Sequence, residues 1–449
     1  FVIGISLILF FGYYLRILPT TGLSTAKHYI LPAVTLAIPI IAAIARFMRA
    51  AMLDGIGENH VSTAVSKGLS DGETARTHIF RNALIPLTTV LGLEVAGIMN
   101  GSIFVEAVFA LPGVGRILVD SVTGRDYPVL QFGLIAYALI VVILNFIIDI
   151  VYVILDPRIR LETYMQQKEH NRQKINILDP LVLSSLGLFL IIFLGIFSPL
   201  IAPHDPNFTN LPVRNLPPIW MEGGRWDFVL GTDNIGRDLL SRCLYGIRTS
   251  FGIATFGLIF SAILGIGLGL CSGLGPLWVD RLIMTITDVF ITLPNILLLL
   301  CGITLFGTEI WVLIVLIGLV RWEAYARLVR GQVLSLRTMG YVESCKALGG
   351  SPFRIALLHI LPNLASPLVV ILTLSFPGVL LMEAGLSFLG VVVQPPTSSL
   401  GRMIGDGRDY LINAWWICGI PSIVIISITL LFQVIGDTLR DRVDVFSDD

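Results

Sequence analysis

The sequence predicts an all-α integral membrane protein built from two homologous units. Hydrophobic residues make up 55% of the 449 residues and charged residues only 14%, whereas soluble domains carry about 25% charged residues. Apolar runs long enough to cross a bilayer as helices recur along the chain. The polar segments between these runs repeat one another in order, which indicates an internal duplication.

About ten apolar runs are predicted to span the membrane, because roughly 20 apolar residues cross a bilayer as a helix. They lie at 1–15, 29–45, 83–105, 127–148, 181–202, 250–279, 282–306, 310–320 (extending to about 326), 363–389 and 411–436. The chain starts with Phe1 inside an apolar run and shows no signal-peptide pattern. We therefore expect further residues ahead of it.

A polar linker at 161–178 divides the chain into a four-span unit at 1–160 and a six-span unit at 179–449. Basic residues gather around 46–82, 156–174 and 321–354. Cytoplasmic loops carry an excess of Lys and Arg. We therefore expect these three segments, including the linker, on the cytoplasmic side.

The two units match at a constant offset over their polar segments. The matched pairs are Arg46 and Arg327, Arg49 and Arg330, Val61 and Val342, Ala64 and Cys345, Gly68 and Gly349, His78 and His359, Asn82 and Asn363, and Pro86 and Pro367. Chance similarity between apolar helices would not align these residue types in order. Two homologous membrane halves are typical of transporters, and a duplicated structural anchor is the alternative.

The repeat centres on two polar segments, which we call coupling loop 1 (about 55–86) and coupling loop 2 (about 331–362). In loop 2 a short helix is predicted to stop at Gly349, because glycine enters the left-handed helix cap without penalty. Ser351 and the proline after it are predicted to start the next helix. In loop 1, Gly68 ends the helix, and Ser70 with Glu73 forms a capping box.

Both loops resemble the EAA loop of bacterial ABC importer permeases. The pattern of an alanine-containing helix, a glycine and a distant I-x-L-P is matched by 343–349 with 360–362. Cys345 stands where alanine is usual, and Ser62 occupies the acidic position of loop 1.

Further motifs resemble the peptide/nickel (oligopeptide–dipeptide) permeases of that family. The segments 202–206, 230–248 and 383–390 are similar to the C-type permease, and 106–115 with 156–158 to the C-terminal part of the B-type permease. The resemblance implies a fusion of that B-type part with a complete C-type permease. It also implies a bacterial inner-membrane importer of di- or oligopeptides, with nickel or another small solute as the alternative.

The resemblance implies that a helix in each loop docks into a partner ATPase subunit. The expected docking residues are Val61, Ala64, Gly68, Tyr341, Glu343, Cys345, Ala347, Leu348 and Gly349. The chain has no G-x-x-x-x-G-K-S/T run that could cradle ATP phosphates. We therefore expect no catalysis and no cofactor in this chain, with ATP and Mg bound by two ATPase subunits and an extracytoplasmic binding protein as a further partner.

Two other sets of polar residues are candidate sites. Polar groups within spans usually face an interior cavity, so Glu94, Asn100, Asp288 and Asn295 are candidates for the translocation pathway; a buried structural role is the alternative. Residues 233–248 are predicted to form a helix on the outer surface. There Asp233, Arg237 and Asp238 are candidates for a gate or a binding-protein contact, or for a cap that only packs over the spans.

Other functional classes find less support in the sequence. The five cysteines and six histidines show no spacing typical of a disulfide framework or a metal site, and there is no basic tract for nucleic acid. An ion-coupled secondary transporter would need polar clusters within several spans, and a membrane enzyme would need catalytic groups at suitable spacing. Both remain as alternatives.

Overall fold

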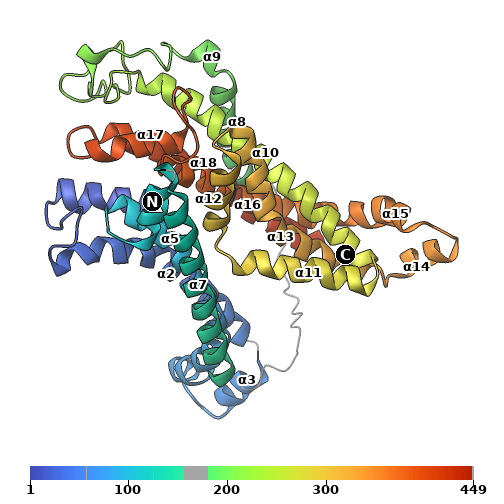
Figure 1. The fold of residues 1–449 in the computed structure, drawn as a ribbon. Coiled ribbons are helices and arrows are strands. Elements are labelled where there is room, and N and C mark those ends of the chain that lie inside the picture. Colours follow the sequence, from blue (N-terminus) through green and yellow to red (C-terminus); the bar gives the residue numbers. More distant parts are fainter. Residues whose placement is uncertain (57, 125, 156–179, 447–449) are drawn as a thin grey trace. The chain divides into compact units, whose positions relative to one another are not determined.

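A computed structural model describes residues 1–56, 58–124, 126–155 and 180–446 (Figure 1). Over these residues the chain is helical, with one isolated bridge between Thr232 and Asp238 and no strand, so the predicted all-α class is confirmed. The chain separates into two compact units, Phe1–Asp120 with Tyr127–Lys168 and Ser121–Asp126 with Glu169–Asp449. The predicted linker at 161–178 lies outside the described residues.

The first unit consists of long apolar helices joined by short ones. They are α1 (Val2–Leu7), η1 (Ile8–Tyr14), η2 (Ala26–Tyr29), α2 (Ile30–Ile56), α3 (Asn59–Ser66), α4 (Asp71–Thr74), η3 (Ala75–Ile79), α5 (Phe80–Val108), α6 (Val114–Thr123, which crosses the unit boundary) and α7 (Tyr127–Leu155). Helix α5 packs against both α2 and α7.

The second unit is a larger helical bundle. Its elements are α8 (Pro180–Ile196), α9 (Ser198–Ile201), η4 (Leu211–Val213), α10 (Leu239–Leu274), α11 (Leu277–Thr292), α12 (Asn295–Phe306), α13 (Ile310–Leu336), α14 (Gly340–Ala347), α15 (Pro352–Ile355), η5 (Ala356–Ile360), α16 (Leu361–Phe388), α17 (Leu400–Gly407), η6 (Arg408–Tyr410) and α18 (Trp416–Phe446). Figure 1 shows α14 and α15 beyond the end of the unit where α10 ends.

Helices α10 and α13 form the centre of this bundle, and glycines allow their close approach. A Cβ atom at Gly265 would lie 2.5 Å from the carbonyl oxygen of Trp322, and one at Gly269 would lie 2.7 Å from the Cβ of Val329. Small residues at one face let helix backbones approach closely within a membrane. The spacing of these glycines by four residues therefore defines the face of α10 that packs against α13.

The predicted spans fall on helices throughout the described residues. Four helices there are long and apolar enough to cross a membrane, and a bent pair makes a fifth: Ala26–Ile56, Leu239–Leu274, Pro352–Phe388, Trp416–Arg442, and Leu277–Thr292 with Asn295–Phe306. The runs at 1–15, 127–148 and 181–202 correspond to the shorter apolar helices Val2–Tyr14, Tyr127–Val141 and Pro180–Ile196.

Three features differ from the sequence-based expectation. The run at 282–306 is not one straight span, because α11 and α12 meet at 95° where Pro294 cannot continue the helical hydrogen bonds. The helix predicted at 233–248 does not lie separately on the outer surface, because α10 runs without interruption from Leu239 into the span. The short helices α6 and α17, which follow the long helices α5 and α16, were not predicted.

Candidate functional site: two coupling loops

In coupling loop 2, helix α14 is closed by a double hydrogen bond at its C-terminal end. The N–H of Gly350 donates to the carbonyl oxygen of Cys345 at 2.9 Å, and the N–H of Gly349 donates to that of Lys346 at 3.0 Å. Gly349 has a φ of +81°. This is the Schellman arrangement, which satisfies helix carbonyls that would otherwise have no donor. The predicted glycine stop is therefore confirmed.

After α14 the chain continues into α15, whose N-terminal end is capped by Ser351. The hydroxyl oxygen of Ser351 accepts from the N–H of Arg354 at 3.3 Å, and Pro352 occupies the first helical position. The side-chain amide of Asn363 donates to the Tyr341 hydroxyl at 3.3 Å and to the carbonyl of His359 at 2.6 Å. Helix α14 is therefore tied to the beginning of α16 by side-chain as well as backbone contacts.

Coupling loop 1 has the same geometry with different residues. Gly68 has a φ of +84°, and the N–H of Leu69 donates to the carbonyl oxygen of Ala64 at 3.3 Å. The Ser70 N–H donates to the Glu73 carboxylate at 3.3 Å, and the Glu73 N–H donates to the Ser70 hydroxyl at 3.4 Å. Both the predicted stop and the predicted capping box are therefore present.

Each coupling loop has a buried face. Val61 is 6% exposed, Ala64 3% and Val342 0%. Val342 packs in a cluster whose other buried members come from α13, α15, η5 and α16: Val329, Val333, Ile355, Ile360, Leu364 and Leu368. Val61 and Ala64 are thus packed inside the chain, and the docking role expected of them stays a prediction.

The exposed face of loop 2 carries large apolar side chains next to charged ones. Leu348 is 89% exposed and Tyr341 44%, while Glu343 and Ala347 are also exposed and Cys345 is half-buried. The sequence analysis did not include Phe353 among the docking residues, although it is 74% exposed on α15. It could have been identified as a bulky apolar residue within a polar segment. A hollow of about 400 Å³ is lined by Arg337, Glu343 and Lys346.

The exposed face of loop 1 is polar by comparison. Ser62, Thr63, Ser66 and Lys67 are exposed on or directly after α3. Lys67 matches Leu348 in the internal repeat, and Ser62 matches Glu343. The two loops therefore share their backbone closure but not the chemistry of their exposed surface.

The four pathway candidates are divided between the units. In the first unit, Glu94 is half-buried on α5, and Asn100 lies on the same helix with a side chain outside the described part. In the second, Asp288 accepts from Arg327 at 2.7 Å at an exposed site. Asn295 is half-buried at the start of α12, just after the bend. The role of these four residues in a translocation pathway stays a prediction.

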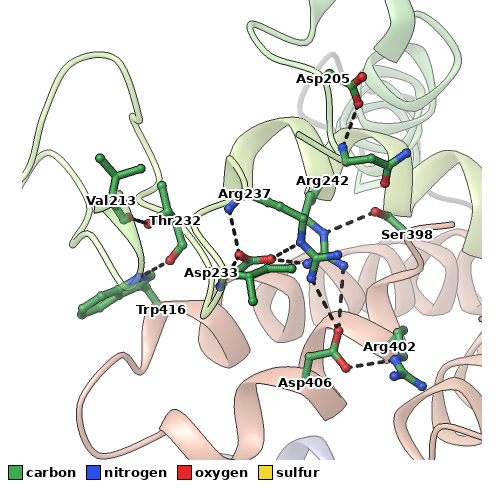
Figure 2. Close-up of polar contacts among 12 residues, drawn as sticks. Asp205, Val213, Thr232, Asp233, Arg237, Arg242, Ser398, Arg402, Asp406 and Trp416 are labelled. Atoms are coloured by element: carbon green, nitrogen blue, oxygen red, sulfur yellow. Dashed lines mark hydrogen bonds and ion pairs between the residues drawn. The ribbon is translucent and has the colours of Figure 1, made fainter. Parts of the chain in front are cut away.

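Two of the residues expected at the outer face, Asp233 and Arg237, belong to an ion-pair cluster (Figure 2). Asp233 is 1% exposed, and its carboxylate accepts from the Arg237 side chain at 2.6 Å and from the Arg242 side chain. Asp406 of α17 lies 3.9 Å from Arg242 and pairs with Arg402 at 2.9 Å. This cluster joins the segment before α10 to α17.

Further bonds fix the same region. The Asp238 carboxylate accepts from the Ser241 N–H at 2.9 Å and so caps α10. The Trp416 indole donates to the carbonyl of Thr232 at 3.2 Å. Asp233, Arg237 and Asp238 are all buried, which favours the alternative of a cap that packs over the spans; a gate or a binding-protein contact stays a prediction.

No cluster of three His, Cys, Asp or Glu side chains suited to a metal ion occurs among the described residues. The five cysteines are free thiols.

Comparison with known proteins agrees with this architecture. The family described as the binding-protein-dependent transport system inner membrane component matches the chain twice, at residues 1–161 and 265–445. The chain is 37% identical to the di/tripeptide transport system permease protein DppC of Pseudomonas aeruginosa over 284 residues, which are 63% of this chain and 91% of the relative.

Two other relatives show comparable similarity. The dipeptide transport system permease protein DppC of Haemophilus influenzae is 36% identical over 57% of this chain and 87% of the relative. The probable D,D-dipeptide transport system permease protein DdpC of Escherichia coli is 35% identical over 59% of this chain and 86% of the relative. The chain thus belongs to the family of multi-pass inner-membrane components of binding-protein-dependent transport systems.

Proposed function

We propose that this chain forms the translocation pathway of an ATP-driven peptide importer and that α3 and α14 dock onto two partner ATPase subunits. The observation that carries the proposal is the shared closure of the two coupling loops around Gly68 and Gly349. The names of the relatives, which are dipeptide and di/tripeptide permeases, support a peptide cargo.

The contacts of α14 explain how it could transmit force. A helix that acts as a lever has to be stiff and firmly attached. Helix α14 is closed by Gly350 at one end, and Val342 fixes it in the cluster shared by α13 and α16. A displacement of α14 by an ATPase would therefore shift the ends of both long helices together.

The proposal requires separate subunits that bind ATP. Its sequence has no P-loop pattern, so ATP and Mg would be bound and hydrolysed on the partner subunits. An extracytoplasmic binding protein would deliver the peptide. In this proposal the chain is the non-catalytic permease component, and its halves at 1–160 and 179–449 correspond to the B-type and C-type permeases.

An uptake experiment tests the proposal. A strain lacking the locus and its complemented form would be supplied with labelled di-, tri- and longer peptides and with nickel. We expect complementation to restore uptake of short peptides, and restored uptake should depend on ATP and persist when an uncoupler removes the ion gradient. Uptake of nickel alone would reassign the cargo. Uptake that stops with the uncoupler while ATP is maintained would contradict the ABC mechanism.

A further inference from the structure

Each unit carries a glutamate near the end of the long helix that follows its coupling loop. Glu106 lies near the end of α5 and Glu383 near the end of α16. The two align in the internal repeat, because 105–107 (Val-Glu-Ala) matches 382–384 (Met-Glu-Ala). A short helix follows in both units, α6 after α5 and α17 after α16. The same residue type before the same element indicates a shared role.

In the first unit, Glu106 contacts the start of α6 directly. Its Oε2 accepts from the backbone N–H of Arg116 at 3.1 Å, which is one of the N–H groups that a helix start leaves without a partner. Glycines allow this approach: a Cβ at Gly113 would lie 2.2 Å from the Glu106 carboxyl carbon, and one at Gly115 would lie 2.7 Å from the Cα of Ile103. Glu106 therefore fixes the beginning of α6 to the end of α5.

In the second unit, the glutamate reaches the short helix through a serine of α10. Glu383 is 0% exposed and accepts from the Ser387 hydroxyl at 2.8 Å. The Ser250 side chain hydrogen-bonds to the same carboxyl group. The Ser250 hydroxyl oxygen in turn accepts from the N–H of Leu400, the first residue of α17, at 3.1 Å. Glu383 and Ser250 therefore join α16, α10 and α17.

Helix α17 lies directly on the backbone of α16. A Cβ at Gly401 would lie 2.1 Å from the carbonyl oxygen of Ala384, and one at Gly405 would lie 2.4 Å from that of Phe388. Residues four apart share one helix face, so this face of α17 is the one placed against α16. The helix also supplies Asp406 to the ion-pair cluster (Figure 2). Its orientation therefore determines how the end of α16 and the segment before α10 fit together.

The short helices lie at the ends of the units opposite to the coupling loops. Helices α5 and α16 begin at these loops, which are predicted to be cytoplasmic. They include the predicted span at 83–105 and the candidate span Pro352–Phe388. Both α6 and α17 follow these spans and are thus predicted at the extracytoplasmic face. This is the face to which the proposed binding protein would deliver its cargo.

We propose that Glu106 and Glu383 are equivalent positioning residues, which hold α6 and α17 in the orientation that receives the cargo-loaded binding protein. The inference rests on the proposed function, to which the binding protein belongs. Loss of the Glu106 carboxylate leaves the Arg116 N–H without this acceptor, and loss of Glu383 releases Ser250; an unmade buried hydrogen bond is costly. The short helix then turns on the long one, while the coupling loop at the other end keeps its contacts.

Uptake at varied concentrations of binding protein tests this role. The complete transporter in proteoliposomes would be supplied with its binding protein loaded with labelled dialanine, and rates would be expressed per assembled transporter. We expect Glu106→Ala and Glu383→Ala to raise the KM for the loaded binding protein about fivefold or more, the equivalent of one lost hydrogen bond. The maximal rate should stay close to that of the wild type. Glu383→Gln should restore the KM, because its amide oxygen still accepts from the serines.

Glu309→Ala is the matched control, because Glu309 is exposed just before α13 and outside α6 and α17; it should keep the wild-type KM. An unchanged KM in both alanine variants would overturn the inference, even if the maximal rate falls, as it does when stability alone is lost. Wild-type uptake that does not depend on the binding protein would overturn it too. Glu106→Ala carries the test if Glu383→Ala fails to assemble. ATP-driven uptake by the wild type with an unchanged KM in the variants removes only the role of the two glutamates.

Discussion

The backbone N–H of Gly350 lies 2.9 Å from the carbonyl oxygen of Cys345 and closes helix α14. The equivalent bond in the first unit joins Leu69 to Ala64 at 3.3 Å. Each unit thus uses a different pair of residues to form the same hydrogen bond, from an N–H to the carbonyl oxygen five residues earlier. The closure depends on backbone geometry, because Gly68 and Gly349 both have φ values in the left-handed region.

Replacing Gly349 with alanine should lower ATP-coupled uptake severalfold. A Cβ at this position would contact nothing within 4 Å, so the effect comes from the left-handed backbone, which costs a non-glycine residue about 1–2 kcal/mol. Uptake and membrane insertion would be measured together. Gly340→Ala is the control, because a Cβ there also meets open space and its φ is not positive. Equal uptake in both variants would exclude a coupling role for the closure.

Replacing Leu348 with aspartate should release the ATPase from loop 2 without unfolding the permease. The side chain is 89% exposed, so the substitution removes no internal packing. Copurification of the ATPase subunits with the permease would measure the loss. Leu305→Asp is the control, since Leu305 is 71% exposed at the end of α12, outside both coupling loops. Undiminished ATPase recovery with Leu348→Asp would contradict the docking assignment.

Val342→Ala should uncouple ATP hydrolysis from transport. Removing two buried methyl groups from this fully buried position costs roughly 2 kcal/mol and loosens α14 from α13 and α16. The exposed docking side chains are unaffected, so we expect ATP hydrolysis to continue while uptake falls. Parallel assays in proteoliposomes would show this as a lower ratio of peptide imported to ATP consumed. A wild-type ratio would mean that the Val342 cluster does not transmit the movement.

Asp233→Asn should destabilise the second unit strongly. Asp233 is buried between Arg237 and Arg242, and removing one partner of a buried ion pair costs about 3–5 kcal/mol. Asp409→Asn is the control, because the pair of Asp409 with Arg408 is exposed and such pairs contribute about 0–1 kcal/mol. Thermal unfolding in detergent would compare them. Similar unfolding temperatures for both variants would show that the cluster in Figure 2 is not structural.

Local features of the loops could be predicted from the sequence because each depends on neighbouring residues. The glycine stops, the Ser70–Glu73 capping box and the Ser351 cap involve groups three to five residues apart. The positions of the long helices follow in the same way from continuous apolar runs.

Features that depend on distant residues could not be predicted. The burial of Val61 is one of them, because periodicity gives the apolar face of a short helix but not the element that covers it. The burial of Asp233 and Arg237 depends on α17, whose Asp406 lies far along the chain. The 95° angle between α11 and α12 is another, because Pro294 predicts a break in the helix but not the direction in which the chain continues.

The most direct test of the coupling assignment is photocrosslinking from single positions of the complete transporter in membranes. A photoreactive amino acid would replace Leu348 in loop 2, Lys67 in loop 1 or, as the control, Leu305. We predict crosslinks to the ATPase subunits from positions 348 and 67, with a yield that changes on addition of ATP and vanadate, and none from position 305. Absence of an ATPase crosslink from both loop positions would contradict the proposal that α3 and α14 couple ATP hydrolysis to transport.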